Sequence, residues 1–157
     1  MLKNQLCYED QLEIENMMEI VELKSTEELE QAFTVLKELR QKLNFRDYLD
    51  IYKKASEKDC FCLVGVFEGK NCLAVMGYRI LYDFVHGKHL YIDDLIVTDK
   101  CRSQGMGAHL LNHAEKIAQE NQCRGLRLCT GIDNHRGKKF YERNNWIAKS
   151  IAFKRPI

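Results

Sequence analysis

Three consecutive β-rich runs in the middle of the chain constrain its fold more than any other feature of the sequence. They cover residues 60–67, 72–82 and 88–97, with a polar tetrapeptide at 68–71 and a loop around Gly87 between them. Connections this short join neighbouring antiparallel strands, because a parallel pair needs a crossover of a dozen or more residues. The runs therefore predict a three-stranded antiparallel meander.

Helical patterns precede the meander. Residues 19–23 indicate a short strand, and Ser25 and Glu28 then form a capping-box pattern at the start of apolar residues that recur at helical spacing. Asn44 is suited to cap a second helix, which the polar cluster at residues 56–59 ends. Two helices are therefore expected between the first strand and the meander.

A helix, a strand, a short helix and a closing strand are expected after the meander. The amphipathic stripe runs from Met106 to about Asn121, followed by a strand at residues 126–130, a helix at about 136–143 and a strand at 146–153. The strand–helix–strand crossover gives one parallel pair in a mostly antiparallel sheet. The predicted fold class is α/β in the mixed (α+β) sense, with a central sheet of about six to seven strands flanked by about four helices.

The composition indicates one domain and excludes two classes of partner. One proline and nine glycines leave no linker-like stretch, so residues 1–157 are expected to form a single domain, with polar residues 1–18 as a flexible segment or an added element. Lys and Arg total 24 against 23 Asp and Glu, a formal net charge of +1. Because this balance creates no broad field for nucleic acid or an anionic membrane, a small or local ligand is expected.

The cysteines and histidines predict neither disulfides nor a metal site. Seven cysteines is an odd number, and no apolar secretory segment opens the sequence, which indicates reduced thiols in the cytoplasm. His109 and His113 have a metal-capable spacing but lack the glutamate of the HExxH pattern and an evident third ligand. Cys101 and Cys129 lack the histidine and acid partners that a nucleophilic cysteine needs. No metal and no covalent role for cysteine are expected.

The densest functional signal lies between the last meander strand and the amphipathic helix, in the segment Arg102-Ser103-Gln104-Gly105-Met106-Gly107-Ala108. Glycines in the first turn of a helix leave backbone N–H groups uncovered, and these donors together with the helix dipole form an anion site. A pyrophosphate group fits such a loop, with Arg102 adding a positive charge. Two other nucleotide motifs fail here, because the dinucleotide fingerprint needs glycine at Leu110 and the phosphate-binding loop needs Gly-Lys-Ser/Thr at residues 107–109.

The pattern Arg-x-x-Gly-x-Gly/Ala, after a strand and before a long helix, resembles the acetyl-CoA pyrophosphate loop of the GNAT acetyltransferases. Arg102, Gly105 and Gly107 match it, and residues 94–97 and 140–143 resemble the family's fourth strand and its last helical motif. The order of elements is similar over nearly the whole chain. The closing segments also resemble the branch that includes aminoalkylphosphonate acetyltransferases.

The sequence departs from the family pattern in two places. Asn145 and Trp146 stand where the family usually has a glycine and a phenylalanine, and Gly137 stands where it usually has an alanine. Asn is the residue after glycine that best tolerates the left-handed conformation of a helix stop. The first departure is therefore expected to leave the helix end intact, and the second to weaken the last helix by roughly 1 kcal/mol.

The resemblance implies that acetyl-CoA is the co-substrate and that the main chain of Leu95, Ile96 and Val97 pairs with its pantetheine arm. Tyr141 matches the family's general acid, which protonates the departing thiolate. Further contacts with CoA are implied for the loop and for two residues beyond it, namely Arg102, Ser103, Gln104, Gly105, Met106, Gly107, Ala108, Asn134 and Lys138.

Asp93 and Asp94 are the candidates for holding the acceptor's ammonium group or drawing a proton from it. Adjacent side chains on a regular strand point to opposite faces, so one of the two is expected to reach the cleft unless a bulge intervenes. Asp94 is favoured, with Ile92 and Ile96 as its neighbours on the same face.

The predicted activity is direct transfer of acetyl from acetyl-CoA to a primary amine of a small molecule. Two alternatives stay open, namely acetylation of a protein lysine or N-terminus and a CoA-binding regulatory domain without turnover. The sequence does not choose the acceptor, because acceptor choice resides in loops such as residues 44–59 and 83–88. It leaves the oligomeric state open as well, with a homodimer as one option.

Overall fold

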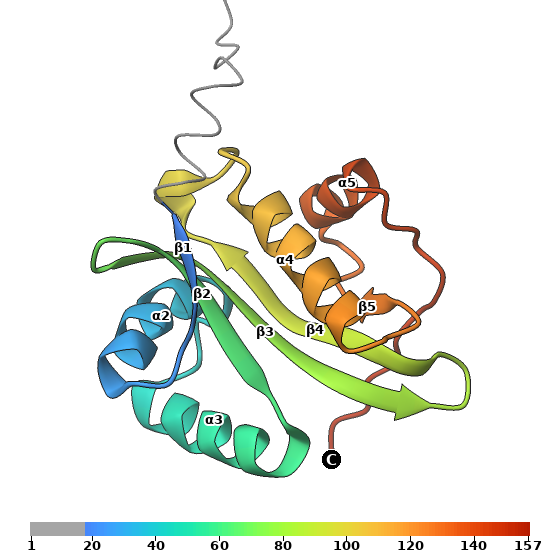
Figure 1. The fold of residues 1–157 in the computed structure, drawn as a ribbon, viewed down its shortest axis with the longest axis horizontal. Helices are drawn as coiled ribbons and strands as arrows, with labels where there is room; N and C mark the ends of the chain where they lie inside the picture. The colour runs from blue at the N-terminus through green and yellow to red at the C-terminus, as the bar shows by residue number, and fades with distance from the viewer. Residues whose placement is uncertain (1–17) are drawn as a thin grey trace, which may run out of the picture.

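The structure is a computed structural model that describes residues 18–157 (Figure 1). The element considered for the first 18 residues therefore lies outside the described residues, apart from Met18. The described part of the chain folds, in order, into β1 (Glu19–Glu22), α2 (Thr26–Leu39), α3 (Phe45–Asp59), β2 (Cys62–Glu68), β3 (Asn71–Asp83), β4 (Gly87–Val97), a 3-10 turn (Asp99–Cys101), α4 (Met106–Glu120), β5 (Leu126–Leu128) and α5 (His135–Arg143).

One five-stranded sheet forms the centre of the molecule, in the order β1-β2-β3-β4-β5. The pairs from β1 to β4 are antiparallel, and β4 and β5 are parallel, as the crossover through α4 requires. The mixed fold class, the meander and the parallel pair are confirmed. No helix among residues 18–157 is both long and apolar enough to cross a membrane.

Helices cover both faces of the sheet, so the domain has three layers (Figure 1). The buried residues form two clusters, one on each face. The α4 cluster joins the sheet to α4 through Val64, Val66, Ala74, Met76, Leu90, Ile92, Met106, Leu110, Leu111, Ala114 and Ala118. The α2/α3 cluster joins the opposite face to α2 and α3 through Leu23, Leu29, Ala32, Val35, Leu36, Tyr48, Leu63, Cys72, Val75 and Ile96.

Local signals set the ends of the helices as the sequence predicts. The Ser25 hydroxyl accepts from the N–H of Glu28 at 3.2 Å, and the Glu28 carboxylate accepts from the N–H of Ser25 at 2.9 Å. Asn44 caps α3 by accepting from the N–H of Asp47 at 2.9 Å. These bonds satisfy donors that the first turn of a helix leaves unpaired, and so determine where each helix begins.

Both departures from the family pattern have a local explanation at α5. Asn145 has φ +64°, and the N–H of Trp146 donates to the carbonyl of Tyr141 at 3.0 Å, which is the Schellman form of helix stop. The left-handed stop at Asn145 is therefore confirmed. At Gly137, an added Cβ would collide with the side-chain amide of Asn134, the N-cap of α5. Glycine thus lets the cap side chain fold over the first turn.

The predicted closing strand at residues 146–153 is wrong. The described chain after α5 is irregular to Ile157, and Ile147, Ile151 and Phe153 are largely exposed (74–96%). A strand needs a partner edge for its backbone groups, and the outer edge of β5 is only three residues long. The sheet accordingly has five strands in place of six or seven.

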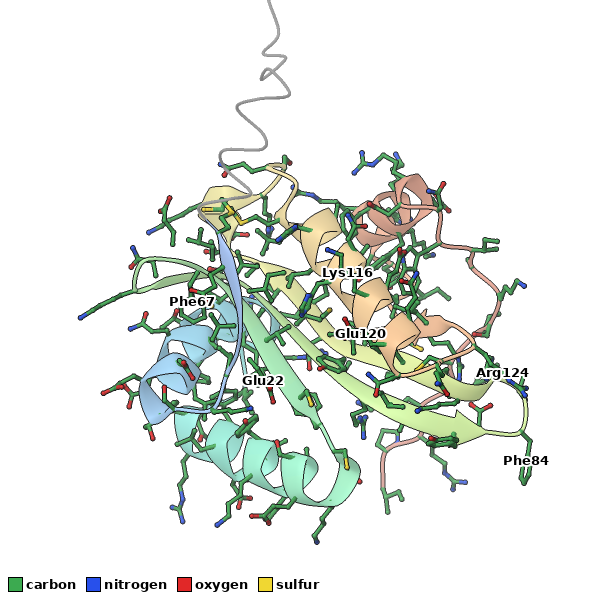
Figure 2. The ribbon with its side chains drawn as sticks, in the orientation of Figure 1. Glu22, Phe67, Phe84, Lys116, Glu120 and Arg124 are labelled. Atoms are coloured by element: carbon green, nitrogen blue, oxygen red, sulfur yellow. The ribbon has the colours of Figure 1, made fainter. Side chains whose placement is uncertain are left out.

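One smaller correction concerns the start of β2. Cys60 is an exposed residue with φ +50° that ends α3, so β2 begins at Cys62 and not within a run from residue 60. All six cysteines within the described residues are free thiols. The hairpin between β3 and β4 ends in Phe84, which projects from the tip into solvent (Figure 2).

Candidate active site

A bulge divides β4 into two parts. Ile92 and Asp94 pair with consecutive residues of β3, so Asp93 is an extra residue between them. The extra residue shifts the alternation of side chains between the two faces of the sheet. Ile92 belongs to the α4 cluster and Ile96 to the α2/α3 cluster. The expectation that Ile92, Asp94 and Ile96 share one face is therefore wrong for Ile92.

The part of β4 after the bulge has a free edge. β5 pairs with β4 only at Leu90, Tyr91 and Ile92, so residues 93–97 have no strand from the described chain on that side. We call this side of residues 93–97 the free edge of β4. Its main-chain donors and acceptors are available to an extended ligand, as the resemblance implies for Leu95, Ile96 and Val97.

The loop after β4 presents uncovered backbone donors beside this edge. Ser103 and Gly105 have φ of +67° and +84°, and Gly105 is the N-cap of α4 without a side chain that could cap it. The first N–H of the helix with a partner is that of His109, which donates to the Gly105 carbonyl at 3.0 Å. The N–H groups of Met106, Gly107 and Ala108 are consequently available at the positive end of the helix dipole.

The two loop glycines serve different purposes. A Cβ on Gly105 would meet no atom within 4 Å, so the space in front of it is open to a ligand. A Cβ on Gly107 would lie 2.9 Å from the ring of Phe140, so this glycine lets α5 pack closely on the first turn of α4. Gln104 is exposed and Met106 is buried in the α4 cluster, which leaves only the main chain of Met106 for a ligand.

Ion pairs and hydrogen bonds hold the start of the loop in place. The carboxylate of Glu38, on α2, accepts from the Thr98 hydroxyl at 2.7 Å and from the N–H of Asp99 at 2.9 Å. Arg102 pairs with Asp99 and donates through Nε to the carbonyl of Val97 at 3.3 Å. The loop is therefore tied to both α2 and the end of β4.

Tyr141 lies on the α4 side of the sheet. It is half-buried, packs against the α4 cluster, and has the rings of Phe140 and Trp146 at 5.2 and 6.1 Å between centroids. Burial raises the pKa of its phenol above the ordinary tyrosine value, so the hydroxyl keeps its proton. This hydroxyl forms no hydrogen bond with residues 18–157, which leaves its proton free for a ligand.

Both acids face the α2/α3 side, because the bulge allows neighbours to point the same way. Asp93 forms a bidentate pair with Arg79 on β3 at 2.9 and 2.5 Å. Arg79 also contacts Asp59, at the end of α3, at 3.6 Å. Asp94 pairs with Arg40, at the end of α2. Asp93 thus has its charge matched within the sheet, whereas Asp94 lies at the mouth of a cavity.

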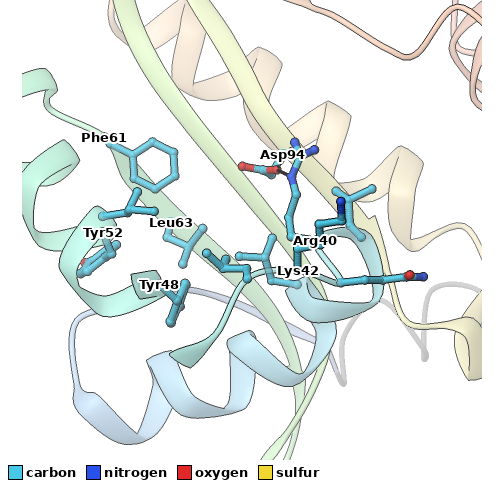
Figure 3. Close-up of a pocket in the computed structure, with 12 residues that line it drawn as sticks. Arg40, Lys42, Tyr48, Tyr52, Phe61, Leu63 and Asp94 are labelled. Carbon is cyan, nitrogen blue, oxygen red and sulfur yellow. Dashed lines mark hydrogen bonds and ion pairs between the residues drawn. The ribbon is translucent and has the colours of Figure 1, made fainter. Parts of the chain in front are cut away.

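A cavity of about 680 Å³ lies between α2, α3 and the sheet, and we call it the α2–α3 cavity. Figure 3 shows its apolar end, with Tyr52, Phe61 and Leu63, and its charged end, with Asp94 and Arg40. It is lined by Leu36, Leu39, Arg40, Gln41, Lys42, Leu43, Tyr48, Ile51, Tyr52, Phe61, Leu63 and Asp94. Its volume is that of a site for a small organic molecule.

Asn134 and Lys138 have structural partners in α5. Asn134 accepts from the N–H of Gly137 at 2.9 Å and donates to the Thr130 hydroxyl at 2.9 Å. Lys138 donates to the carbonyl of Ile132 at 2.6 Å. Contacts of these two side chains with CoA stay a prediction. No group of three potential metal ligands lies together within residues 18–157.

Comparison with known proteins identifies the family. The sequence profile of the acetyltransferase (GNAT) family matches residues 20–146. The chain belongs to the GNAT family. The uncharacterized N-acetyltransferase YhdJ of Bacillus subtilis (strain 168) is 28% identical over 142 residues, which is 90% of this chain and 100% of the relative. This GNAT protein is therefore an acyl-CoA-dependent acetyltransferase.

Solved structures share the fold of this GNAT acetyltransferase at low identity. A transcriptional regulator from Bacillus halodurans C-125 has a TM-score of 0.80 and 19% identity, over 89% of this chain and 99% of that one. The acetyltransferase AAC(6')-Iy, in complex with the bisubstrate analogue CoA-S-monomethyl-acetylneamine, has a TM-score of 0.78 and 16% identity, over 89% and 98%. The narrower resemblance to aminoalkylphosphonate acetyltransferases stays a prediction.

Arg40 and Lys42 are site residues that the sequence did not point to. They end α2 and begin the loop to α3, and nothing in their local pattern separates them from other exposed cations. Arg40 donates a hydrogen bond to Asp94, which lies 54 residues later in the sequence. Only the packing of α2 on β4 brings them together.

Proposed function

We propose that this GNAT acetyltransferase transfers acetyl from acetyl-CoA directly to the primary amine of a small molecule held in the α2–α3 cavity. One observation carries the proposal. The free edge of β4 lies between a loop with uncovered backbone donors on the α4 side and a cavity with an acid at its mouth on the opposite side. Ligands bound on the two faces of the sheet can meet at this free edge, because no strand of the described chain separates them there.

Residues around the free edge would hold the acetyl donor. The N–H groups of residues 104–108 and the guanidinium of Arg102 suit a pyrophosphate, because they combine uncovered donors, a helix dipole and a positive charge. The main chain of Leu95, Ile96 and Val97 suits an extended amide-bearing arm. Acetyl-CoA supplies the activated thioester, and these contacts would fix its orientation.

Asp94 would act on the acceptor. Its carboxylate attracts the ammonium group, and it accepts the proton that the nitrogen must lose before attack, directly or through water. The amine nitrogen then bonds to the thioester carbonyl carbon, and the carbon–sulfur bond breaks. A main-chain N–H near Val97 would stabilise the charge on the carbonyl oxygen during this step.

Tyr141 would complete the reaction by giving its phenolic proton to the departing thiolate. The raised pKa and the hydroxyl, unpaired among residues 18–157, support this role, since the proton is present at neutral pH and no acceptor in that part of the chain competes for it. The proton that Asp94 accepts leaves to solvent. The nitrogen releases a second proton as the amide forms, and this proton restores the phenol through water, so the protein is unchanged after each turnover.

Thiol release tests the proposed function against the two alternatives. The protein is mixed with acetyl-CoA and either small primary amines, peptides or no acceptor, and free thiol and acetylated product are measured. The proposal expects release that depends on a small amine. Release with peptides alone would indicate a protein acetyltransferase. Protection from heat by acetyl-CoA without release for any acceptor would indicate a regulatory domain.

A further inference from the structure

The pair of Arg40 and Asp94 is arranged unlike the neighbouring pair of Arg79 and Asp93. Arg79 and Asp93 use two nitrogens and two oxygens, so both oxygens of the Asp93 carboxylate are occupied, and the third nitrogen of Arg79 contacts Asp59. By contrast, Nε and Nη2 of Arg40 both contact a single oxygen of Asp94, Oδ1, at 2.8 and 2.6 Å. Oδ2 of Asp94 and Nη1 of Arg40 have no partner within the described residues.

These two atoms carry opposite charges and belong to neighbouring side chains that both line the α2–α3 cavity. Asp94 Oδ2 accepts hydrogen bonds from a cation, and Arg40 Nη1 donates them to an anion. An α-amino acid carries an ammonium and a carboxylate on the same carbon atom. A ligand of this kind would pair with both groups at once, with its ammonium on Asp94 and its carboxylate on Arg40.

The net charge of the cavity supports the same ligand. Its charged lining residues are Arg40, Lys42 and Asp94, two cations and one anion. A simple amine would match Asp94 but would leave Arg40 without its acid partner. A carboxylate beside the amine restores that partner, and Lys42 adds further attraction for it.

The rest of the cavity indicates the side chain. Beyond the charged end, the lining is aliphatic and aromatic, with Tyr52, Phe61 and Leu63 at the far side (Figure 3). Burial of an apolar group there is favourable in proportion to its area. The Tyr48 hydroxyl, which has no partner among the described residues, is a single polar group in this lining, so a charged side chain would lose its hydration without a matching set of partners.

We infer that the acceptor is a free α-amino acid with a bulky apolar side chain, bound by Asp94 at its ammonium, by Arg40 at its carboxylate and by the apolar end of the cavity at its side chain. This inference rests on the proposed function for the identity of the reacting amine. Three separate points of contact further predict that one enantiomer binds better than the other.

Calorimetric titration tests the inference independently of turnover. The probes are phenylalanine, leucine and methionine, each compared with its methyl ester and with the amine that lacks the carboxylate. The intact protein should bind at least one of these amino acids about tenfold to hundredfold more tightly than its ester and its amine, the range for a hydrogen bond to a charged group. Equal affinities within every set, or no measurable binding of any amino acid, would overturn the inference.

Three variants assign the carboxylate to Arg40. Arg40→Gln should abolish the preference for the acid over the amine, while Arg40→Lys should retain part of it. Arg46→Gln is the matched control, because Arg46 is exposed on the first turn of α3 and does not line the cavity. If correctly folded Arg40→Gln still bound the amino acid more tightly than the amine, the inference would be wrong. If the preference is present but no amine is acetylated, the proposed function fails and the ligand of the cavity stands.

Discussion

Between Leu90 and Ile92, β4 is paired on both sides, whereas after the unpaired bulge residue Asp93, from Asp94 to Val97, it is paired with β3 alone among the described strands. The doubly paired part contains Leu90, which is fully buried in the α4 cluster. The part after Ile92 contains both acids and ends at the glycine loop. One strand thus contributes to the hydrophobic core in its doubly paired part and offers a free edge in the part that follows.

The bulge at Asp93 is the boundary between the two parts. It allows two acids in sequence to face the α2/α3 side, and it lies where pairing with β5 stops. One inserted residue thus separates, along a single strand, the part that stabilises the fold from the part proposed to bind ligands. Substitutions in the two parts should therefore have different effects.

The largest expected effect belongs to the chemistry beside the free edge. Tyr141→Phe should lower turnover by roughly 10² to 10⁴-fold, the usual range for one general acid or base, with little change in affinity for acetyl-CoA. Because the hydroxyl forms no hydrogen bond with the described residues, the melting temperature should stay near that of the parent. Turnover and melting are measured on the same preparation. A folded variant with parental turnover would remove Tyr141 from the mechanism.

The second prediction contrasts the two parts of β4 directly. Leu90→Ala should lower the free energy of unfolding by about 2–5 kcal/mol, because it removes a fully buried side chain. Leu95→Ala, at the free edge, should have a smaller effect, since Leu95 is only partly buried. Denaturant titration measures both. Equal losses would mean that the free edge contributes to the core as much as the paired part does.

The third prediction uses two glycines that both have positive φ, a conformation that is strained for residues with a side chain. Gly105 and Gly69 have φ of +84° and +60°, and a Cβ on either meets no atom within 4 Å. Leucine at either position should lower stability by about 1–2 kcal/mol, because a left-handed conformation is strained for residues with a side chain. Only Gly105→Leu should lose protection from heat by acetyl-CoA. Parental protection of Gly105→Leu would place the phosphate site elsewhere.

The smallest effect concerns the acceptor side and its dependence on pH. The Tyr48 hydroxyl is buried without a hydrogen-bond partner in the described chain, so Tyr48→Phe should raise stability by about 1 kcal/mol. Burial raises the pKa of this phenol, so the folded protein holds the proton more tightly than the unfolded chain. Below the ordinary tyrosine pKa, the phenol is protonated in both states and its ionisation takes nothing from the stability of the folded protein. Above that pKa, the unfolded chain ionises first, so stability is lost as pH rises toward the raised pKa of the folded protein.

Unfolding free energies measured across the alkaline range check this expectation. The parent should lose stability from about pH 10 upward, where unfolded tyrosine ionises, and Tyr48→Phe should lose less. Identical slopes for the two proteins would show that another group governs the alkaline limb. Tyr78 and Tyr141, whose pKa values burial also raises, are the next candidates.

Local chemistry explains which parts of the fold were predictable from sequence. The capping residues Ser25 and Asn44, the meander and the left-handed stop at Asn145 depend on neighbours within a few residues, and each was found where the sequence indicated. The strand at residues 146–153 was wrongly predicted, because its apolar alternation describes a strand but supplies no edge to pair with. The bulge has no local signal either, since Asp93-Asp94 differs little from other acidic pairs.

The candidate site also has parts that local sequence indicates and parts that it does not. The loop at residues 102–108 could be picked out as a candidate phosphate site, because such a site uses contiguous main chain. The role of Gly107 in admitting Phe140, the pairing of Asp94 with Arg40, and the α2–α3 cavity all depend on contacts between distant segments. Such contacts follow from packing, which residue patterns alone do not specify.

The residues that line the α2–α3 cavity come from positions 36–63 of the chain, with the single exception of Asp94. Every residue expected to contact CoA lies after Asp94. The proposed acceptor and donor sides are therefore nearly separate stretches of sequence that meet at one strand. Glu38 is the exception, because its carboxylate holds Thr98 and Asp99 at the start of the loop. For an engineer, residues 36–63 form an exchangeable cassette as long as Glu38 is kept, so that the choice of amine could be changed while the proposed machinery for the acetyl donor is retained.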